Sequence, residues 1–159
     1  MNPTETPAAI PVPKFGAELL AHAKGPAGEA WAALAELFFQ FGRPQIMNAG
    51  NALELSPPQG IVIRFLDEPR PMGELAAMMR CDSSNMTGIV DRLEERGLVR
   101  RTAAEGDRRI KLIALTGQGQ ELRTEMTRRM AEPPEPIERL SAKDQRALRD
   151  ILRRALDEA

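Results

Sequence analysis

Apolar residues recur every three to four positions along most of the chain, a spacing typical of helices with one buried face. The first such helix starts near Glu29, and Pro44 is expected either to kink it or to stop and restart it before Gly50. Its apolar face is made of Trp31, Leu34, Phe38 and Phe41. The preceding segment, 1–27, has four prolines in its first 13 residues and is predicted to be a flexible tail.

Three further helices are predicted between Ser56 and Gly97. Ser56 followed by Pro57 favours a helix start. The serine side chain can accept a hydrogen bond from a backbone N–H of the first turn, and a proline at the first helical position costs no hydrogen bond, because the N–H that it lacks would have no partner within the helix. A short third helix spans about 72–79, and the fourth spans 83–96 with Asp82 as its cap. Gly97 supplies its left-handed end.

After Gly97 the pattern changes to that of strands. Residues 98–102 and 109–115 are predicted to pair across a turn at 103–107. The segment from 99 to 111 contains five basic residues and two acidic ones, so it is basic overall. A fifth helix then starts after Thr116, and a sixth starts at Ser141. The apolar stripe of the sixth helix consists of Leu148, Ile151, Leu152 and Ala155. The fold class is therefore mainly α with a small basic β-hairpin.

Composition excludes several classes of function. The chain has 159 residues, enough for one core, with a single cysteine (Cys81), a single histidine (His22) and a net charge of −1. No disulfide framework, Cys/His zinc site, nucleophile–base pair or glycine-rich phosphate loop is present, so we expect no metal, no cofactor and no enzymatic activity. We find neither a leader pattern nor an apolar run of membrane length and expect a cytoplasmic protein without membrane contact.

Two short helices followed directly by a two-stranded hairpin are typical of a winged helix-turn-helix, here predicted over 56–116. The second helix of such a pair fits the major groove of duplex DNA, while a basic hairpin tip reaches phosphate or the minor groove. The candidate DNA contacts are Ser83, Ser84, Asn85, Thr87, Gly88, Arg92, Arg101, Arg108 and Arg109. A winged helix that has lost DNA binding and serves as a protein-interaction scaffold is the alternative. Steep salt dependence of DNA binding would distinguish the two.

Three stretches resemble the MarR regulators (multiple antibiotic resistance regulators), and the resemblance covers about residues 29–158. Residues 85–99, NMTGIVDRLEERGLV, look like the recognition helix of that family and its exit into the wing. Asp107-Arg108-Arg109 looks like its wing motif, and residues 55–59, LSPPQ, like the start of its second helix. The sequence departs from the family at Gly88, where many members carry a longer polar side chain.

The resemblance implies a homodimer that binds a palindromic operator. Segments 28–55 and 117–159 would form its dimerisation helices, Arg109 would enter the minor groove, and Asp107 would hold that arginine. It also implies a repressor or activator, most simply a repressor released by a small aromatic or phenolic effector, or a regulator controlled by oxidation. Cys81 is more typical of a half-buried apolar residue than of a redox sensor. Residues that could line an effector pocket, or simply form core, include Trp31, Phe38, Met47 and Met72.

Overall fold

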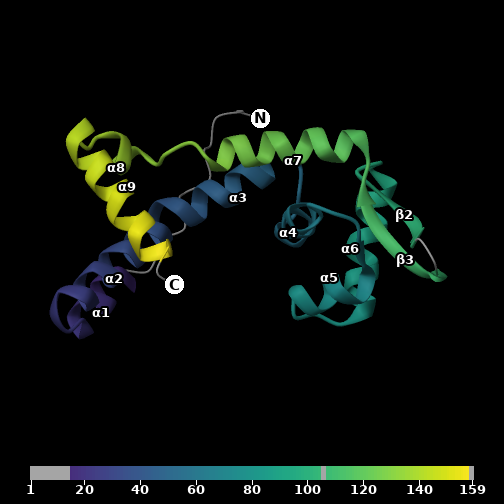
Figure 1. Ribbon diagram of the computed structural model, residues 1–159, viewed down its shortest axis with the longest axis horizontal. Coiled ribbons are helices and arrows are strands. Elements are labelled where there is room, and N and C mark those ends of the chain that lie inside the picture. The colour runs from purple at the N-terminus through teal and green to yellow at the C-terminus, as the bar shows by residue number, and fades with distance from the viewer. Residues whose placement is uncertain (1–14, 105–106, 158–159) are drawn as a thin grey trace, which may run out of the picture. The chain divides into compact units, whose positions relative to one another are not determined.

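The computed structural model describes residues 15–104 and 107–157, and their side chains over 18–103 and 111–157 (Figure 1). The chain divides into two compact units, one up to Gln45 and one from Ile46 onward.

The first unit is helical. Helix α1 (Phe15–His22) packs against α2 (Gly25–Leu37), and Gly25 between them has a φ of +66°, a left-handed conformation that glycine adopts without strain. The predicted flexible tail is therefore wrong from Phe15 onward, while residues 1–14 lie outside the described part. The apolar residues at positions 15, 19 and 20 already carried the helical spacing, but the neighbouring prolines masked it.

Pro44 does not stop the helix. The π-helical segment η1 (Phe38–Gly42) follows α2 directly, and α3 (Arg43–Asn51) follows η1. The Arg43 N–H donates to the Phe38 carbonyl five residues back, which widens the turn just before a proline that has no N–H to donate. The irregularity expected at Pro44 is thus a wider turn rather than a break.

The second unit contains the predicted helix pair. Helices α4 (Pro57–Phe65), α5 (Met72–Met78) and α6 (Ser83–Glu95) confirm the expected segments to within one or two residues. The start of α4 is fixed by a capping box, in which the Ser56 N–H donates to Gln59 Oε1 at 2.9 Å. Gly97, with a φ of +69°, ends α6 as expected.

The sheet has one strand more than the sequence predicted. Strands β2 (Val99–Ala104) and β3 (Asp107–Leu115) form the hairpin, and β1 (Arg70–Pro71) pairs with the other edge of β3, giving the order β1-β3-β2. Ala104 pairs with Asp107, so the predicted turn over 103–107 is too long. A two-residue strand containing a proline leaves no alternating pattern from which to predict β1.

One apolar core joins α4, α5, α6, the sheet and the next helix, α7 (Gly117–Met130). Its largest fully buried side chains are Ile63, Leu75, Met86, Leu93, Leu98, Ile113, Val62, Val90 and Val99. Because the buried face of α6 is anchored in this core, its opposite face is left to solvent.

Two helices follow α7. The short α8 (Glu135–Glu138) was not predicted, since Pro134 and Pro136 indicated only a helix end. Helix α9 (Ala142–Asp157) confirms the sixth predicted helix, and the Ser141 hydroxyl accepts from the Asp144 N–H at 3.2 Å at its start. No residue of α9 is buried in the single chain, and Ile151 is 54% exposed.

Candidate nucleic-acid interface

The N-terminal end of α6 is held by Asp82. Its carboxylate oxygen Oδ1 accepts from the Ser84 hydroxyl at 2.6 Å and from the Asn85 backbone N–H at 2.8 Å. The bond from Ser84, followed by that from Asn85, lowers the pKa of Asp82 below its ordinary value. The first turn of α6 is therefore ordered by the chain itself, before any partner binds.

The outward face of α6 carries the residues predicted to contact DNA. Ser83, Ser84, Asn85, Thr87 and Arg92 are all exposed, and Gly88 is partly exposed. The side chains of Asn85 and Arg92 have no hydrogen bond or ion pair with other described residues, so their donors remain available. The Thr87 hydroxyl, by contrast, donates to the Ser83 carbonyl at 2.8 Å.

Gly88 leaves open space on this face. A Cβ built there meets no atom within 4 Å, so the fold itself does not require glycine at this position. Gly88 therefore presents only backbone on this face, at the position where the resemblance implies a longer polar side chain in many members of the family.

The wing is fixed at its base by Thr116. The Thr116 hydroxyl donates to the Gly97 carbonyl at 2.6 Å and accepts from the Gly119 N–H at 3.0 Å, which links the end of α6 to the start of α7. Asp107, Arg108 and Arg109 belong to β3, but their side chains lie outside the described part of the structure. Their predicted roles stay predictions.

Arg101, the remaining predicted contact, faces back onto α6. Its guanidinium forms ion pairs with Asp91, at 2.5 Å between Nη2 and Oδ1, and with Glu94. The hydrogen bond with Asp91 raises the pKa of Arg101 above its ordinary value. The preceding residue, Arg100, is exposed and its side chain has no partner among the described residues.

Two arginines that the sequence did not single out join loops to this domain. Arg96, at the end of α6, donates to the carbonyls of Glu54 at 2.6 Å and Leu53 at 3.1 Å. Arg70 of β1 pairs with Asp67, Glu68 and Glu74. Contacts between Arg96 and residues more than 40 positions away leave no local pattern in the sequence.

The four predicted effector residues lie in different surroundings. Met47 lines a largely apolar hollow of about 190 Å³ whose other walls come from α4 and α7. Met72 packs against the winged-helix core. In the first unit, Trp31 lines a separate hollow between α1 and α2 and is 65% exposed, and Phe38 stacks edge-on against Phe39.

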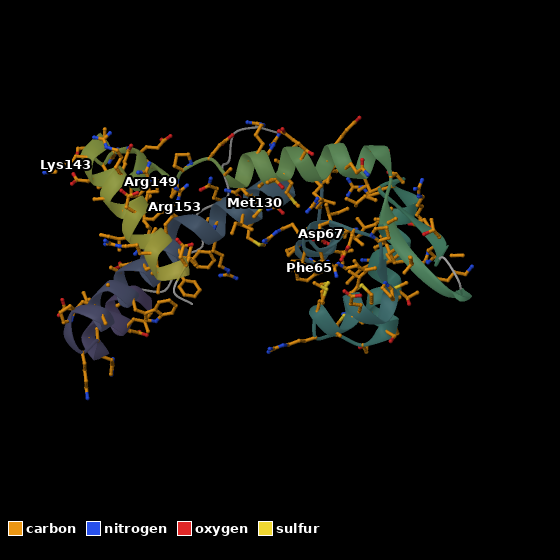
Figure 2. All side chains as sticks on the ribbon, in the orientation of Figure 1. Phe65, Asp67, Met130, Lys143, Arg149 and Arg153 are labelled. Carbon is orange, nitrogen blue, oxygen red and sulfur yellow. The ribbon has the colours of Figure 1, made fainter. Side chains whose placement is uncertain are left out.

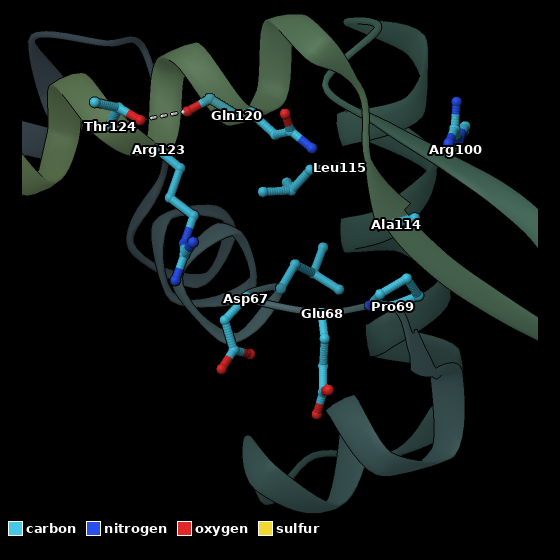
Figure 3. A pocket seen from close by; sticks show the side chains of 10 residues that line it. Asp67, Glu68, Pro69, Arg100, Ala114, Leu115, Gln120, Arg123 and Thr124 are labelled. Atoms are coloured by element: carbon cyan, nitrogen blue, oxygen red, sulfur yellow. Dashed lines mark hydrogen bonds between the residues drawn. The ribbon is translucent and has the colours of Figure 1, made fainter.

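A more polar hollow of about 370 Å³ lies between α7, the sheet and the loop after α4 (Figure 3). Figure 3 shows Arg123 reaching from α7 toward the loop that carries Asp67 and Glu68, while Arg100 comes from β2. Both carboxylates are already bound by Arg70. This hollow therefore offers mixed charges rather than a concentrated site for one ion.

Residues that could hold a metal ion do not gather in the described part of the chain. No group of three or more His, Cys, Asp or Glu side chains lies close enough together there. Across the same residues, no helix is both long enough and apolar enough to cross a membrane.

The chain is a winged helix-turn-helix protein, because helices α5 and α6 are followed directly by the hairpin of β2 and β3 and the outward face of α6 is exposed. Proteins of this class bind DNA. Residues 55–111 match the model of the MarR family. Over 113 residues the chain is 32% identical to the uncharacterized HTH-type transcriptional regulator YfiV of Bacillus subtilis, covering 67% of this chain and 71% of that protein. The chain belongs to the MarR family and is a DNA-binding transcriptional regulator rather than an enzyme.

Solved structures share this fold. The transcriptional regulator Tm0710 of Thermotoga maritima matches with a TM-score of 0.67 and 24% identity, over 79% of this chain and 89% of that one. A MepR variant of Staphylococcus aureus bound to an oligodeoxyribonucleotide matches with a TM-score of 0.61 and 18% identity, over 80% of this chain and 96% of that one. At these identities the likeness concerns the fold.

Proposed function

We propose that the chain reads an operator with the first turn of α6 in the major groove of DNA. One observation carries the proposal: Ser83, Ser84, Asn85 and Thr87 are exposed together at the positive end of a helix whose other face is anchored in the core. Short polar groups at a helix N-terminus suit both phosphate and base contacts. Arg92 lies further along the same helix and would reach the adjacent sugar-phosphate backbone of the DNA.

The wing would supply the second contact. Arg108 and Arg109 lie in β3 next to the hairpin turn. A narrow minor groove concentrates negative potential and favours an inserted guanidinium, and Asp107 would orient Arg109 without removing its charge.

The experiment compares Arg109→Ala with Ser84→Ala. Loss of Arg109 should weaken binding to all DNA, because one phosphate-neutralising charge is gone. The salt slope, which is the steepness with which the logarithm of the binding constant falls with the logarithm of salt concentration, should decrease by about 0.9 per subunit. Loss of Ser84 should leave the salt slope unchanged. It should reduce the difference in binding free energy between the operator and a random duplex by about 1–3 kcal/mol. Asp107→Ala should behave as a milder Arg109→Ala. An unchanged slope and affinity in Arg109→Ala would contradict the wing assignment, and absence of DNA binding in the unmodified protein would favour the scaffold alternative.

We also propose a homodimer. Apolar side chains are exposed on both end segments: in the first unit Trp31 is 65% and Phe38 47% exposed, and on α9 Ile151 is 54% exposed. Exposed apolar faces of this kind mark an interaction surface, and in a symmetric dimer a second copy of the chain would cover them with the same faces. Two recognition helices related by a twofold axis would read an imperfect palindrome with half-sites about 34–36 Å apart.

The hollow beside Met47 supports the proposal of an effector that releases a repressor from DNA. Its apolar walls include Ile61, Met126 and Met130, with the exposed Arg64 at its edge. At about 190 Å³ it is smaller than the ~300–1,000 Å³ of drug-sized pockets, so it suits a single aromatic ring.

Benzoate and phenol are suitable probes for this hollow. Either should weaken operator binding by the unmodified protein, and Met130→Glu, which places a carboxylate in the apolar wall, should abolish the effect of benzoate. Operator binding that is insensitive to both probes at millimolar concentration would contradict the proposed effector class.

A further inference from the structure

Arg101 is bound from two positions on α6. Its Nη2 lies 2.5 Å from Asp91 Oδ1, its Nη1 pairs with Glu94 Oε2, and its backbone N–H donates to Glu94 Oε1 at 3.1 Å. Glu94 therefore binds both the main chain and the side chain of one wing residue. Asp91 and Glu94 lie about one helical turn apart, so the guanidinium bridges successive turns of α6.

The electrostatics of this cluster oppose a role in binding phosphate. One guanidinium faces two carboxylates, which leaves the three groups with a net charge of −1. The Arg101 side chain is also only 29% exposed. Arg100 provides a matched contrast, because neighbouring strand residues point to opposite faces and Arg100 is exposed without a partner among the described side chains.

We infer that Arg101 is a positioning residue, which sets the wing against the recognition helix and does not itself bind DNA. The inference rests on the proposed DNA-binding mode. A site made of two elements works only when both are held within about 0.5 Å of the productive geometry. Strand β2 continues from the cluster to Ala104 at ~3.3 Å per residue. A small rotation at Arg101 therefore displaces the far end of β2 by a larger distance than it displaces Arg101 itself.

The test uses two duplexes: a palindrome selected from random sequences with the unmodified protein, and a scrambled duplex of the same length and composition. Binding constants are measured at four salt concentrations for Arg101→Gln and for the control Arg100→Gln. Urea unfolding of each variant is measured in parallel, and the assay is run well below the temperature at which either variant unfolds.

Arg101→Gln should reduce the ratio of selected to scrambled affinity by roughly tenfold, within the coupling range of one ion-pair network, and leave the salt slope unchanged. Arg100→Gln, which removes a neighbouring exposed arginine and leaves the cluster intact, should leave the ratio of selected to scrambled affinity unchanged. Arg101→Lys, which keeps the charge but loses the forked geometry, should recover only part of the ratio. A charge-only role would predict full recovery.

A double-mutant cycle isolates the contact itself. Asp91→Asn should reduce the same ratio, and adding it to Arg101→Gln should cause little further loss, because the pair is already broken. A lowered salt slope in Arg101→Gln, an unchanged affinity ratio, or additive losses in the cycle would each overturn the inference. Failure of the unmodified protein to bind either duplex would instead overturn the proposed function.

Discussion

At the scale of single residues, Gly119 lies where α7 passes close to the chain that leaves α6. A Cβ built on Gly119 would lie 2.0 Å from the Leu98 carbonyl oxygen and 3.2 Å from Leu115 Cδ2. The nearer obstacle is backbone, which cannot rotate away as a flexible side chain can. Gly119→Ala should therefore lower the free energy of unfolding by about 3 kcal/mol, the upper range for overpacking, as measured by urea denaturation followed by circular dichroism.

Gly88→Ala is the matched control for that prediction. Gly88 also lies in a helix, but a Cβ there meets nothing within 4 Å. Alanine should raise the free energy of unfolding by about 0.4–1 kcal/mol, since it restricts the unfolded chain and favours the helix. Equal effects of the two substitutions would show that helix propensity, rather than the contact with Leu98, decides the result.

At the scale of the element, we expect the ion pairs of Glu125 with Arg128 and Arg129 to stabilise α7 in a pH-dependent way. Hydrogen bonds from Arg128, and then from Arg129, lower the pKa of Glu125 to about 2. Because the folded pKa lies below the unfolded value, this stabilisation is complete above about pH 4.5 and is lost as the pH falls toward 2. The difference in free energy of unfolding between the unmodified protein and Glu125→Gln should therefore shrink across that range.

Denaturation by urea at a series of pH values checks this prediction. Glu121→Gln is the control, because Glu121 is an exposed carboxylate of α7 whose side chain has no partner among the described residues. A difference for Glu125→Gln that stays constant from pH 5 to pH 2 would show that the ion pairs seen in α7 contribute nothing to folding in solution, as many exposed pairs do not.

At the scale of the whole molecule, the exposed apolar faces predict that α9 contributes to dimerisation. The side chain of Ile151 lies in the stripe with Leu148 and Leu152, whereas Lys143, Arg149 and Arg153 are among the charged residues along the same helix (Figure 2). Ile151→Asp would place a charge in an apolar interface and should weaken the dimer by at least about 2 kcal/mol, the cost typical of a central contact.

Light scattering with size-exclusion chromatography measures the outcome. The unmodified chain should show twice its mass of 17.6 kDa at micromolar concentration, and Ile151→Asp should shift toward the single mass. Met78→Asp serves as the control, because Met78 is an apolar residue of α5 that is 40% exposed and lies outside both end segments. A single-chain mass for the unmodified protein would refute the dimer.

The sequence by itself determined the local elements of this protein. Helix periodicity, the caps at Ser56, Asp82 and Thr116, and the left-handed end at Gly97 all depend on residues a few positions apart. The outward face of α6 could likewise be predicted, because the residues near its start that do not belong to the apolar face are short and polar. Elements of two to four residues, β1 and α8, escaped prediction since they are too short for any period.

Only the tertiary structure decided which charges are available to a partner. Arg100 and Arg101 are adjacent and chemically identical, and the sequence pattern led us to name Arg101, not Arg100, among the candidate DNA contacts. The packing of β2 beside α6 brings Arg101 to Asp91 and Glu94, and the alternation of the strand leaves Arg100 in solvent. Arg96, which binds the carbonyls of Leu53 and Glu54, depends on the fold in the same way. Such pairings follow from which elements meet, and that is set by burial of the shared core rather than by local sequence.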